Sequence, residues 1–231
     1  MTASLDACPV CGGCEFTCSE VLWRSLINEW QLAPAEADYI NRQQGLMCTA
    51  CGSNLRSMAL AAAICAEYGA AGTLQAELTA PAASRADILE INEAGMLTPL
   101  LASLPGHRIA KYPDVDIHAL PFAEESFDVV LHSDTLEHVE NPVHALTECR
   151  RVLRTGGLLA FTVPTVVERL TRSRAGLPPS FHGAPGDVRP DFRVQSEFGA
   201  DVWTYVIRAG FFRTTLHALL YPAGLAITAR K

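Results

Sequence analysis

Six cysteines near the start of the sequence have the residue type and spacing best suited to chemistry. Cys8 and Cys11 form one C-x-x-C-G turn, and Cys48 and Cys51 form a second. Glycine permits the tight bend in which backbone N–H groups turn toward the thiolates. Four thiolates from two such turns make a closed tetrahedral zinc site. We therefore expect Cys8, Cys11, Cys48 and Cys51 to bind a structural Zn²⁺ ion.

An iron–sulfur cluster is the alternative for the same region. The first run has the C-x2-C-x2-C-x3-C spacing of bacterial ferredoxins, in Cys8, Cys11, Cys14 and Cys18. Ser19 stands where proline is usual, and the second C-x-x-C-G turn would have no role. Under the zinc interpretation, Cys14 and Cys18 are nearby thiols without a metal.

The bulk composition limits the possible functions. With 231 residues, the chain is long enough for one ordinary domain and a small attachment. A formal net charge of −7 disfavours nucleic acid as the main partner. No apolar run has the length of a membrane span, and residues 1–10 lack the basic and apolar regions of a secretory signal. We expect a cytoplasmic protein without membrane contact, whose cysteines serve as metal ligands.

The elements that would position the functional residues lie mainly in residues 116–164. Residues 127–132 and 158–163 are short apolar, β-branched runs, which predict buried strands of a parallel sheet. Between them, Asn141 can cap a helix whose first residue is Pro142. We expect Gly156-Gly157 to end this helix.

Further elements are expected on both sides of this unit. We expect a helix capped by Ser19, a helix started by Pro34, an Ala-rich helix capped by Ser53, and helices at 96–104 and 201–209. Strands are expected at 86–91, 107–112, 211–219 and 226–229, the last two as an antiparallel pair. The expected units are a zinc module (1–57), a linker helix and loop (58–84) and an α/β domain (85–231). Residues 165–190 have the length of a binding loop or a disordered connection.

The order of several short motifs resembles that of a known protein family. LPF (120–122), FDVV (127–130), LEHV (136–139), a proline-started helix and RVLRTGG (151–157) follow one another. This order resembles class I S-adenosylmethionine (SAM) dependent methyltransferases of the methyltransferase-11 type, over roughly residue 86 to the C-terminus. The resemblance implies a Rossmann-like α/β sheet with helices on both faces, and SAM as the cofactor. The predicted fold class is this sheet with a small N-terminal zinc-binding module that has four cysteine ligands.

The resemblance places a cofactor turn after the strand at 86–91, where the family has E-x-G-x-G-x-G. Glu90 and one displaced glycine, Gly95, remain, whereas Asn92 and Ala94 replace glycines. Side chains therefore stand where backbone usually approaches SAM, although asparagine tolerates positive φ better than most residues. The resemblance implies that Glu90, Asn92 and Gly95 bind the cofactor through a modified turn. Loss of SAM binding is the alternative.

Further cofactor contacts are implied after the second and fourth strands. Asp116 matches the acid that reads the adenine amino group, which leaves Asp114 or the Tyr112 ring for the ribose hydroxyls. An ordinary turn carboxylate is the alternative for Asp114. The carboxyl edge of an open α/β sheet binds ligands, which places the methionine part of SAM near His132, Ser133 and Asp134.

Two histidines are candidates for the proton acceptor. His138 belongs to LEHV, and His182 lies in the long connection, where such enzymes place lids over the acceptor. A neutral imidazole accepts a proton from a hydroxyl as the methyl transfers, and we rank His182 before His138. A structural hydrogen bond is the alternative for His138. Three arginines would clamp an anionic acceptor or else form a solvated helix face: Arg169, Arg172 and Arg174.

These residues predict a SAM-dependent methyltransferase acting on a small-molecule or glycan-type acceptor. Among enzymes, a ribosomal RNA methyltransferase is the competing prediction, because some of these join a zinc module to this fold. The acidic net charge disfavours it. A non-catalytic binding or scaffold protein on a degenerate methyltransferase fold is the alternative from another class, since a fold alone does not establish activity.

Overall fold

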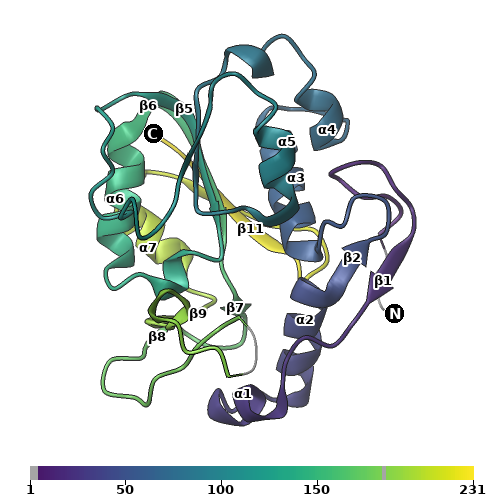
Figure 1. Ribbon diagram of the computed structural model, residues 1–231, viewed down its shortest axis with the longest axis vertical. Helices are drawn as coiled ribbons and strands as arrows, with labels where there is room; N and C mark the ends of the chain where they lie inside the picture. The colour runs from purple at the N-terminus through teal and green to yellow at the C-terminus, as the bar shows by residue number, and fades with distance from the viewer. Residues whose placement is uncertain (1–4, 184–185) are drawn as a thin grey trace.

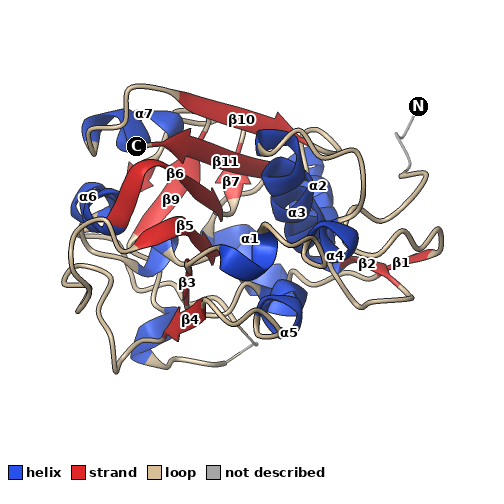
Figure 2. Ribbon diagram, turned by 90° about the horizontal axis from the view of Figure 1, so that it is seen from above, coloured by secondary structure: helices blue, strands red, loops and turns tan. Residues whose placement is uncertain are grey.

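A six-stranded sheet forms the centre of the structure, a computed structural model that describes residues 5–183 and 186–231. Its strand order is β10-β11-β6-β5-β3-β4. The strands are β3 (Ile88–Ile91), β4 (His107–Ala110), β5 (Phe127–Ser133), β6 (Leu153–Thr162), β10 (Thr214–Ala218) and β11 (Leu225–Arg230). β4, β3, β5 and β6 are parallel, whereas β11 runs antiparallel to both β6 and β10. The predicted Rossmann-like sheet and its antiparallel closing pair are therefore confirmed (Figure 2).

Both faces of this sheet are buried, as its apolar runs predict. Val129 and Leu131 of β5 belong to the core beneath helix α3 (Leu55–Glu67), which packs on β11 and β6. Val130, between them, belongs to the core on the opposite face, which contains Leu146 of α6 (Pro142–Val152) and Val206 of α7 (Trp203–Arg208). Successive side chains of a strand alternate between faces, so a strand covered on both sides is apolar throughout.

Helix α6 begins as predicted but ends earlier. The Asn141 side-chain oxygen accepts a hydrogen bond from the His144 N–H at 3.1 Å, and Pro142 occupies the first turn. β6 begins directly at Leu153, so the two glycines lie inside that strand rather than at the end of the helix. The register between β5 and β6 shifts here, and Gly156 has φ +80°. Gly156-Gly157 therefore forms an irregularity in the pairing of β6 with β5, which is a correction to the prediction.

The N-terminal part consists of a two-stranded ribbon and two helices beside α3 (Figure 1). Its elements are β1 (Phe16–Cys18), α1 (Arg24–Glu29), α2 (Pro34–Gly45) and β2 (Leu46–Cys48). Pro34 starts α2 as predicted. Ser19 caps no helix, because α1 begins later and the Ser19 N–H instead donates to the carbonyl of Gly45 at 3.1 Å.

Helix α3 crosses the expected boundary between residues 57 and 58. Its N-cap is Asn54 rather than Ser53, because the Asn54 side-chain oxygen accepts from the Ser57 N–H at 3.0 Å. The helix covers one face of the central sheet and continues directly from the second cysteine turn. It is thus part of the main core, and the division into three units stays a prediction.

The expected long connection at 165–190 contributes two strands to a small sheet, β7 (Thr165–Val166) and β8 (Arg172–Ser173). The third strand, β9 (Ser196–Gly199), follows the connection and lies between them, in the order β7-β9-β8. The remaining helices are α4 (Leu74–Glu77), α5 (Thr98–Leu101) and the 3-10 turns Ala83–Arg85, Gly95–Leu97, Leu136–His138 and Pro190–Phe192. Among the described residues, no helix combines the length and the apolar character needed to cross a membrane.

Substituting Gly45 by alanine tests the close approach of α2 and β1. A Cβ at Gly45 would lie 1.9 Å from the backbone oxygen of Ser19, so one of the two segments must move. We expect Gly45→Ala to lower the free energy of unfolding by about 2 kcal/mol or more in a denaturant titration. Gly72→Ala is the matched control, because its Cβ would meet only the end of the flexible Glu77 side chain, at 3.2 Å. Equal stability of the two variants would contradict this account.

Candidate active site

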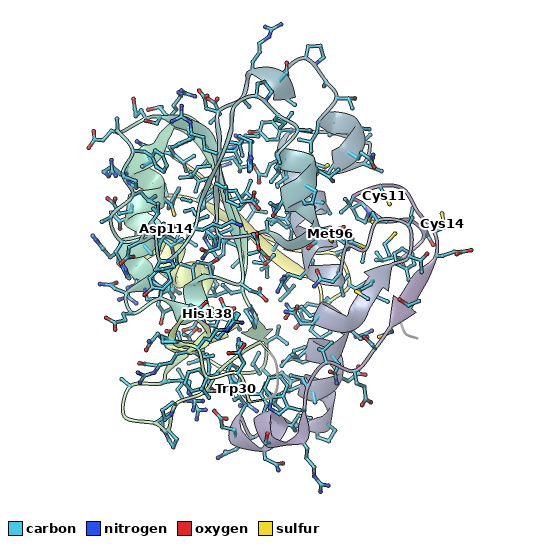
Figure 3. The ribbon with its side chains drawn as sticks, in the orientation of Figure 1. Cys11, Cys14, Trp30, Met96, Asp114 and His138 are labelled. Carbon is cyan, nitrogen blue, oxygen red and sulfur yellow. The ribbon has the colours of Figure 1, made fainter. Side chains whose placement is uncertain are left out.

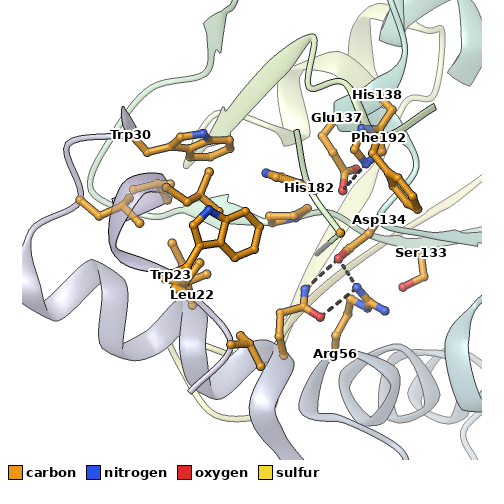
Figure 4. Close-up of a pocket in the computed structure, with 18 of the residues that line it drawn as sticks. Leu22, Trp23, Trp30, Arg56, Ser133, Asp134, Glu137, His138, His182 and Phe192 are labelled. Atoms are coloured by element: carbon orange, nitrogen blue, oxygen red, sulfur yellow. Dashed lines mark hydrogen bonds and ion pairs between the residues drawn. The ribbon is translucent and has the colours of Figure 1, made fainter. Parts of the chain in front are cut away.

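A cavity of about 470 Å³ lies at the carboxyl edge of the central sheet (Figure 4). The sheet side is lined by residues that follow β5 and β6, including Ser133, Asp134, Glu137, His138 and Pro164. The opposite wall comes from residues 21–44 and includes Leu22, Trp23, Leu26 and Trp30. The sequence analysis placed ligands at this edge, but it did not predict that the N-terminal helices form a wall of the cavity.

Trp30, at the end of α1, joins this wall to the segment after β6. Its indole N–H donates to the Ser180 hydroxyl at 2.9 Å, and its ring centroid lies 5.1 Å from that of His182. His182 in turn lies 5.5 Å from His138, ring centroid to centroid, in a T-shaped arrangement. Figure 3 shows Trp30 below His138 in the region between α1 and the sheet. An aromatic residue of the N-terminal part therefore contacts one of the predicted proton acceptors, His182.

The three arginines of the connection are paired with carboxylates, and they do not lie on a helix. Arg169 forms an ion pair with Glu36 of α2, and it donates to the carbonyls of Trp30 at 2.8 Å and Gln31 at 2.7 Å. Arg172 and Arg174 both pair with Glu197 of β9, and the buried Arg174 also pairs with Glu29 of α1 at 3.1 Å. All three guanidinium groups are thus committed to carboxylates within the protein.

Asp134 belongs to a cluster of three hydrogen-bonded side chains on the cavity surface. It takes φ +45° directly after β5, and its carboxylate accepts from the Gln44 amide at 2.8 Å and forms an ion pair with Arg56. Arg56 also donates to the Gln44 side-chain oxygen at 3.1 Å. Sequence reasoning missed Gln44, and for Arg56 it favoured a place in the first turn of the Ala-rich helix over a functional role. The available signal was the position of Arg56 just after the second cysteine turn, at the start of α3.

The predicted histidines lie beside Glu137 at the same cavity. One possible ligand atom from each of Glu137, His138 and His182 lies within 4.8 Å of the others. The Nδ1 of His138 is 3.0 Å from the carbonyl oxygen of Arg193, and a carbonyl only accepts, so Nδ1 carries the proton. Its Nε2 then presents a lone pair and lies 3.6 Å from Glu137 Oε1. The structure thus brings both predicted proton acceptors together with a carboxyl group that was not predicted to take part.

Burial shifts the pKa values of Glu137, His138 and His182. It lowers the pKa of His182 to about 4, and it also lowers the pKa of His138 below the ordinary value. Burial, reinforced by the nearby charge of Asp134, raises the pKa of Glu137 well above its ordinary range. Both imidazoles are therefore neutral near pH 7 and can accept a proton or bind a cation.

The predicted cofactor turn has positive φ at two positions, Asn92 and Gly95. Asn92 has φ +58°, its amide bonds to the Thr135 hydroxyl at 3.3 Å, and its oxygen accepts from the Tyr112 N–H at 3.0 Å. Gly95 has φ +60°, and a Cβ there would lie 2.9 Å from the Ser57 hydroxyl. Glu90 is fully buried and accepts from the Ala94 N–H and from His107, both at 2.7 Å. It therefore holds the turn in place.

The other predicted cofactor residues lie in different environments. Tyr112 and Asp114 are exposed after β4, and Asp116 accepts from the His118 N–H at 2.8 Å, which lowers the pKa of Asp116. Ser133 lines the cavity and bonds to the Thr162 hydroxyl at 2.7 Å.

His132 is a correction to the predicted cofactor set. Its side chain lies in the core against Phe161, with 4.9 Å between ring centroids, and burial lowers its pKa to about 3. Among the described residues, neither ring nitrogen has a hydrogen-bond partner. The side chain points to the face of the sheet opposite α3, because successive strand residues alternate between the two faces.

The four cysteines of the two C-x-x-C-G turns converge. The Sγ atoms of Cys8 and Cys51 are 3.8 Å apart, those of Cys11 and Cys48 are 3.7 Å apart, and all four lie within 4.8 Å of one another. Zn–S bonds of about 2.3 Å in tetrahedral geometry put sulfur atoms about 3.8 Å apart, so the donor set fits Zn²⁺. Cys14 and Cys18 are exposed and lie outside the cluster, so the ferredoxin-type set is not assembled.

The cysteine cluster packs against the cofactor turn. A Cβ on Gly52 would lie 3.7 Å from the Met96 side chain, next to Gly95. Burial would raise the pKa of Cys51, but hydrogen bonds from Ser53 and the neighbouring thiols lower it to about 7. The second turn is thus suited to supply a thiolate and also supports the segment that precedes α5.

Residues 50–161 match the family model described as "Methyltransferase domain". These residues, slightly less than half of the chain, are therefore similar to a methyltransferase domain. The match also includes residues that precede the expected domain at 85–231, among them those of α3.

Curated relatives agree with this assignment. The chain is 29% identical over 167 residues to a probable S-adenosylmethionine-dependent methyltransferase of Mycolicibacterium smegmatis, covering 69% of this chain and 56% of that protein. It is 46% identical over 48 residues to a ubiquinone biosynthesis O-methyltransferase of Cereibacter sphaeroides, covering 21% of this chain and 19% of that protein. The chain therefore spans about half, or less, of the length of these relatives.

Among solved structures, a SAM-dependent methyltransferase of Thermotoga maritima, described as a possible histamine N-methyltransferase, is similar to this chain. The TM-score is 0.42 and the identity is 17%, over 68% of this chain and 86% of that one.

Glu36 provides a pH-dependent test of the cavity wall. Burial would raise its pKa, but hydrogen bonds from Arg169 and from the Ala33 N–H lower it below the ordinary value. A lowered pKa contributes stability above the unfolded-state pKa of about 4.3, and this contribution is lost as the pH falls through the folded-state value. We expect Glu36→Gln to cost about 1–2 kcal/mol at pH 7, and less at pH 3, in denaturant titrations. Asp38→Asn, at an exposed carboxylate of the same helix, should have little effect at either pH.

Proposed function

We propose that this protein is a SAM-dependent methyltransferase that acts on a small-molecule or glycan-type acceptor in the cavity. The observation that carries the proposal is the cavity itself. It extends from Glu93 and Ser133, beside the cofactor turn, to the aromatic wall of Trp23 and Trp30 and the neutral His182. One continuous space thus adjoins both the predicted cofactor site and the candidate proton acceptors.

The cofactor would be held by the residues after β3, β4 and β5. We propose contacts from the turn of Asn92 and Gly95, with Glu90 fixing its shape, from Asp116 to the adenine and from Asp114 or Tyr112 to the ribose. Ser133 and Asp134 would lie at the methionine part. The side chain of Asn92 at φ +58° supports a modified rather than a lost turn, because it accepts a conformation that normally requires glycine.

Methyl transfer needs a positioned nucleophile and, for a hydroxyl acceptor, removal of a proton. When bound, SAM supplies an electrophilic methyl group on a sulfonium ion. The walls of the cavity would hold the acceptor oxygen toward the predicted cofactor site, where the bound cofactor would supply the methyl group. We propose that His182, with His138 beside it, receives the hydroxyl proton, because both imidazoles are neutral at pH 7.

The lining favours a small acceptor over RNA. The N-terminal wall offers indole and aliphatic surfaces on which a sugar or aromatic ring can pack. Arg56, which lines the cavity, is paired with Asp134, and Arg169 and Arg174 are paired with Glu36 and Glu197. The net charge of −7 also disfavours the binding of phosphates. The name of the Cereibacter sphaeroides relative supports an oxygen acceptor.

Binding of S-adenosylhomocysteine to the metal-loaded protein tests this function. We expect a micromolar dissociation constant by calorimetry, and affinity about tenfold weaker for Asp114→Asn, since hydrogen bonds to a charged carboxylate are among the stronger polar contacts. Glu124→Gln, at an exposed carboxylate of the same loop, is the control. No binding by the folded parent protein would favour the non-catalytic scaffold. Binding that is unchanged in Asp114→Asn would move the ribose contact to Tyr112.

We also propose that Cys8, Cys11, Cys48 and Cys51 hold a structural Zn²⁺ ion. Elemental analysis of purified protein should give one zinc per chain. Cys11→Ser should lose the metal and lower the unfolding midpoint by about 10 °C or more, because a structural zinc contributes folding energy directly. Cys14→Ser, at the exposed thiol outside the cluster, should keep both the metal and the unfolding midpoint of the parent protein. Visible absorbance from iron, or a folded protein without metal, would contradict the assignment.

A further inference from the structure

We propose that Glu137, His138 and His182 bind a divalent first-row transition-metal cation, which holds the acceptor oxygen in the cavity. One ligand atom from each residue lies within 4.8 Å of the others, and all three residues line the cavity (Figure 4). This site is separate from the cysteine cluster, whose thiols do not line the cavity. The role assigned to the cation rests on the proposed methyltransferase function, whereas the binding site itself does not.

Glu137 provides the first argument. It is 1% exposed, and neither carboxylate oxygen has a hydrogen-bond partner among the described residues. Buried carboxylates are normally paired or coordinate metals, because leaving one without compensation is costly. Arg56, a positive group whose charge acts on Glu137, is already paired with Asp134. A cation between Glu137 and the two imidazoles would supply the missing partner.

His138 provides the second argument, because its tautomer is fixed for ligation. Its Nδ1–H donates to the Arg193 carbonyl at 3.0 Å, which leaves Nε2 unprotonated and 3.6 Å from Glu137 Oε1. Metal-bound histidines typically donate their other ring N–H to a carbonyl or carboxylate in this way. The backbone of Glu137 is tied to the same segment, since its carbonyl accepts from the Gln195 N–H at 2.7 Å.

His182 is brought to the cluster from a separate part of the chain. Its backbone N–H donates to the Phe192 carbonyl at 2.9 Å, and its ring packs on Trp30, whose indole is held by Ser180. The third ligand is therefore positioned by contacts that do not involve the cation. A site assembled before binding loses little freedom when the metal enters.

The donor set indicates the kind of cation. Two imidazoles and one carboxylate suit manganese, iron, cobalt or zinc better than magnesium or calcium, which prefer oxygen ligands. Three protein ligands leave coordination positions for water or an acceptor oxygen. Such an oxygen loses its proton more readily, so with the cation bound the proton passes to solvent, and the transfer to His182 proposed above applies only to protein without the cation. The methyl transfer itself is unchanged and no group is oxidised or reduced.

Manganese binding to the full chain tests the site. The protein is first loaded with Zn²⁺ and freed of weakly bound metal, and Mn²⁺ is then titrated by electron paramagnetic resonance. We expect one Mn²⁺ per chain, and affinity at least about tenfold weaker for Glu137→Gln and for His182→Asn. Glu140→Gln and His144→Asn are matched controls, because both residues are exposed and lie outside the cavity lining. Circular dichroism establishes that each variant is folded.

The outcomes separate this proposal from the proposed function. Absence of Mn²⁺ and Co²⁺ binding by the folded, zinc-loaded parent would overturn the site, as would equal affinity in the Glu137→Gln variant and the parent. S-adenosylhomocysteine binding is measured on the same samples. Cofactor binding without cation binding rejects only the metal site. Cation binding without cofactor binding supports the site and rejects its role in methyl transfer.

Discussion

The cavity depends on one partly buried set of ion pairs that joins the first helices to the segment after β6. Arg169 contacts Glu36 of α2 and two carbonyls at the end of α1. Arg174 links Glu29 of α1 to Glu197 of β9. Removing one partner from such a pair leaves an uncompensated charge, so these contacts fix the geometry strongly even where their net stabilisation is small. The two sides of the cavity are held at a defined separation as a result.

This arrangement gives the N-terminal part a second role beside its cysteine cluster. Residues 21–44 form the apolar wall of the cavity, and α3 extends from the second cysteine turn onto the central sheet. The same turn packs against Met96 and the start of α3 against Gly95. A change in the cysteine cluster would therefore reach the cofactor turn through direct packing.

The cofactor turn and the histidine cluster illustrate two ways in which polar groups are accommodated. At the turn, Glu90 accepts hydrogen bonds from backbone and side chains, so its buried charge is compensated internally. At the cluster, Glu137 has no such donors among the described residues and faces two neutral imidazoles. Compensation inside the fold is typical of a structural carboxylate, whereas a carboxylate left open at a cavity is typical of a binding group.

Local signals in the sequence were sufficient to predict the strands of the central sheet, the start of α6, the two cysteine turns and the edge of the sheet at which the cavity lies. Apolar periodicity, capping residues and short spacings act over a few residues, so they can be read without the fold. The folded chain was needed to show that Arg169 and Arg174 pair with carboxylates of the N-terminal helices, that His132 lies in the core, and that His182 reaches Glu137 and His138. Periodicity shows that a side chain is buried or exposed, but not which distant segment it meets, because such contacts depend on how all the elements pack together.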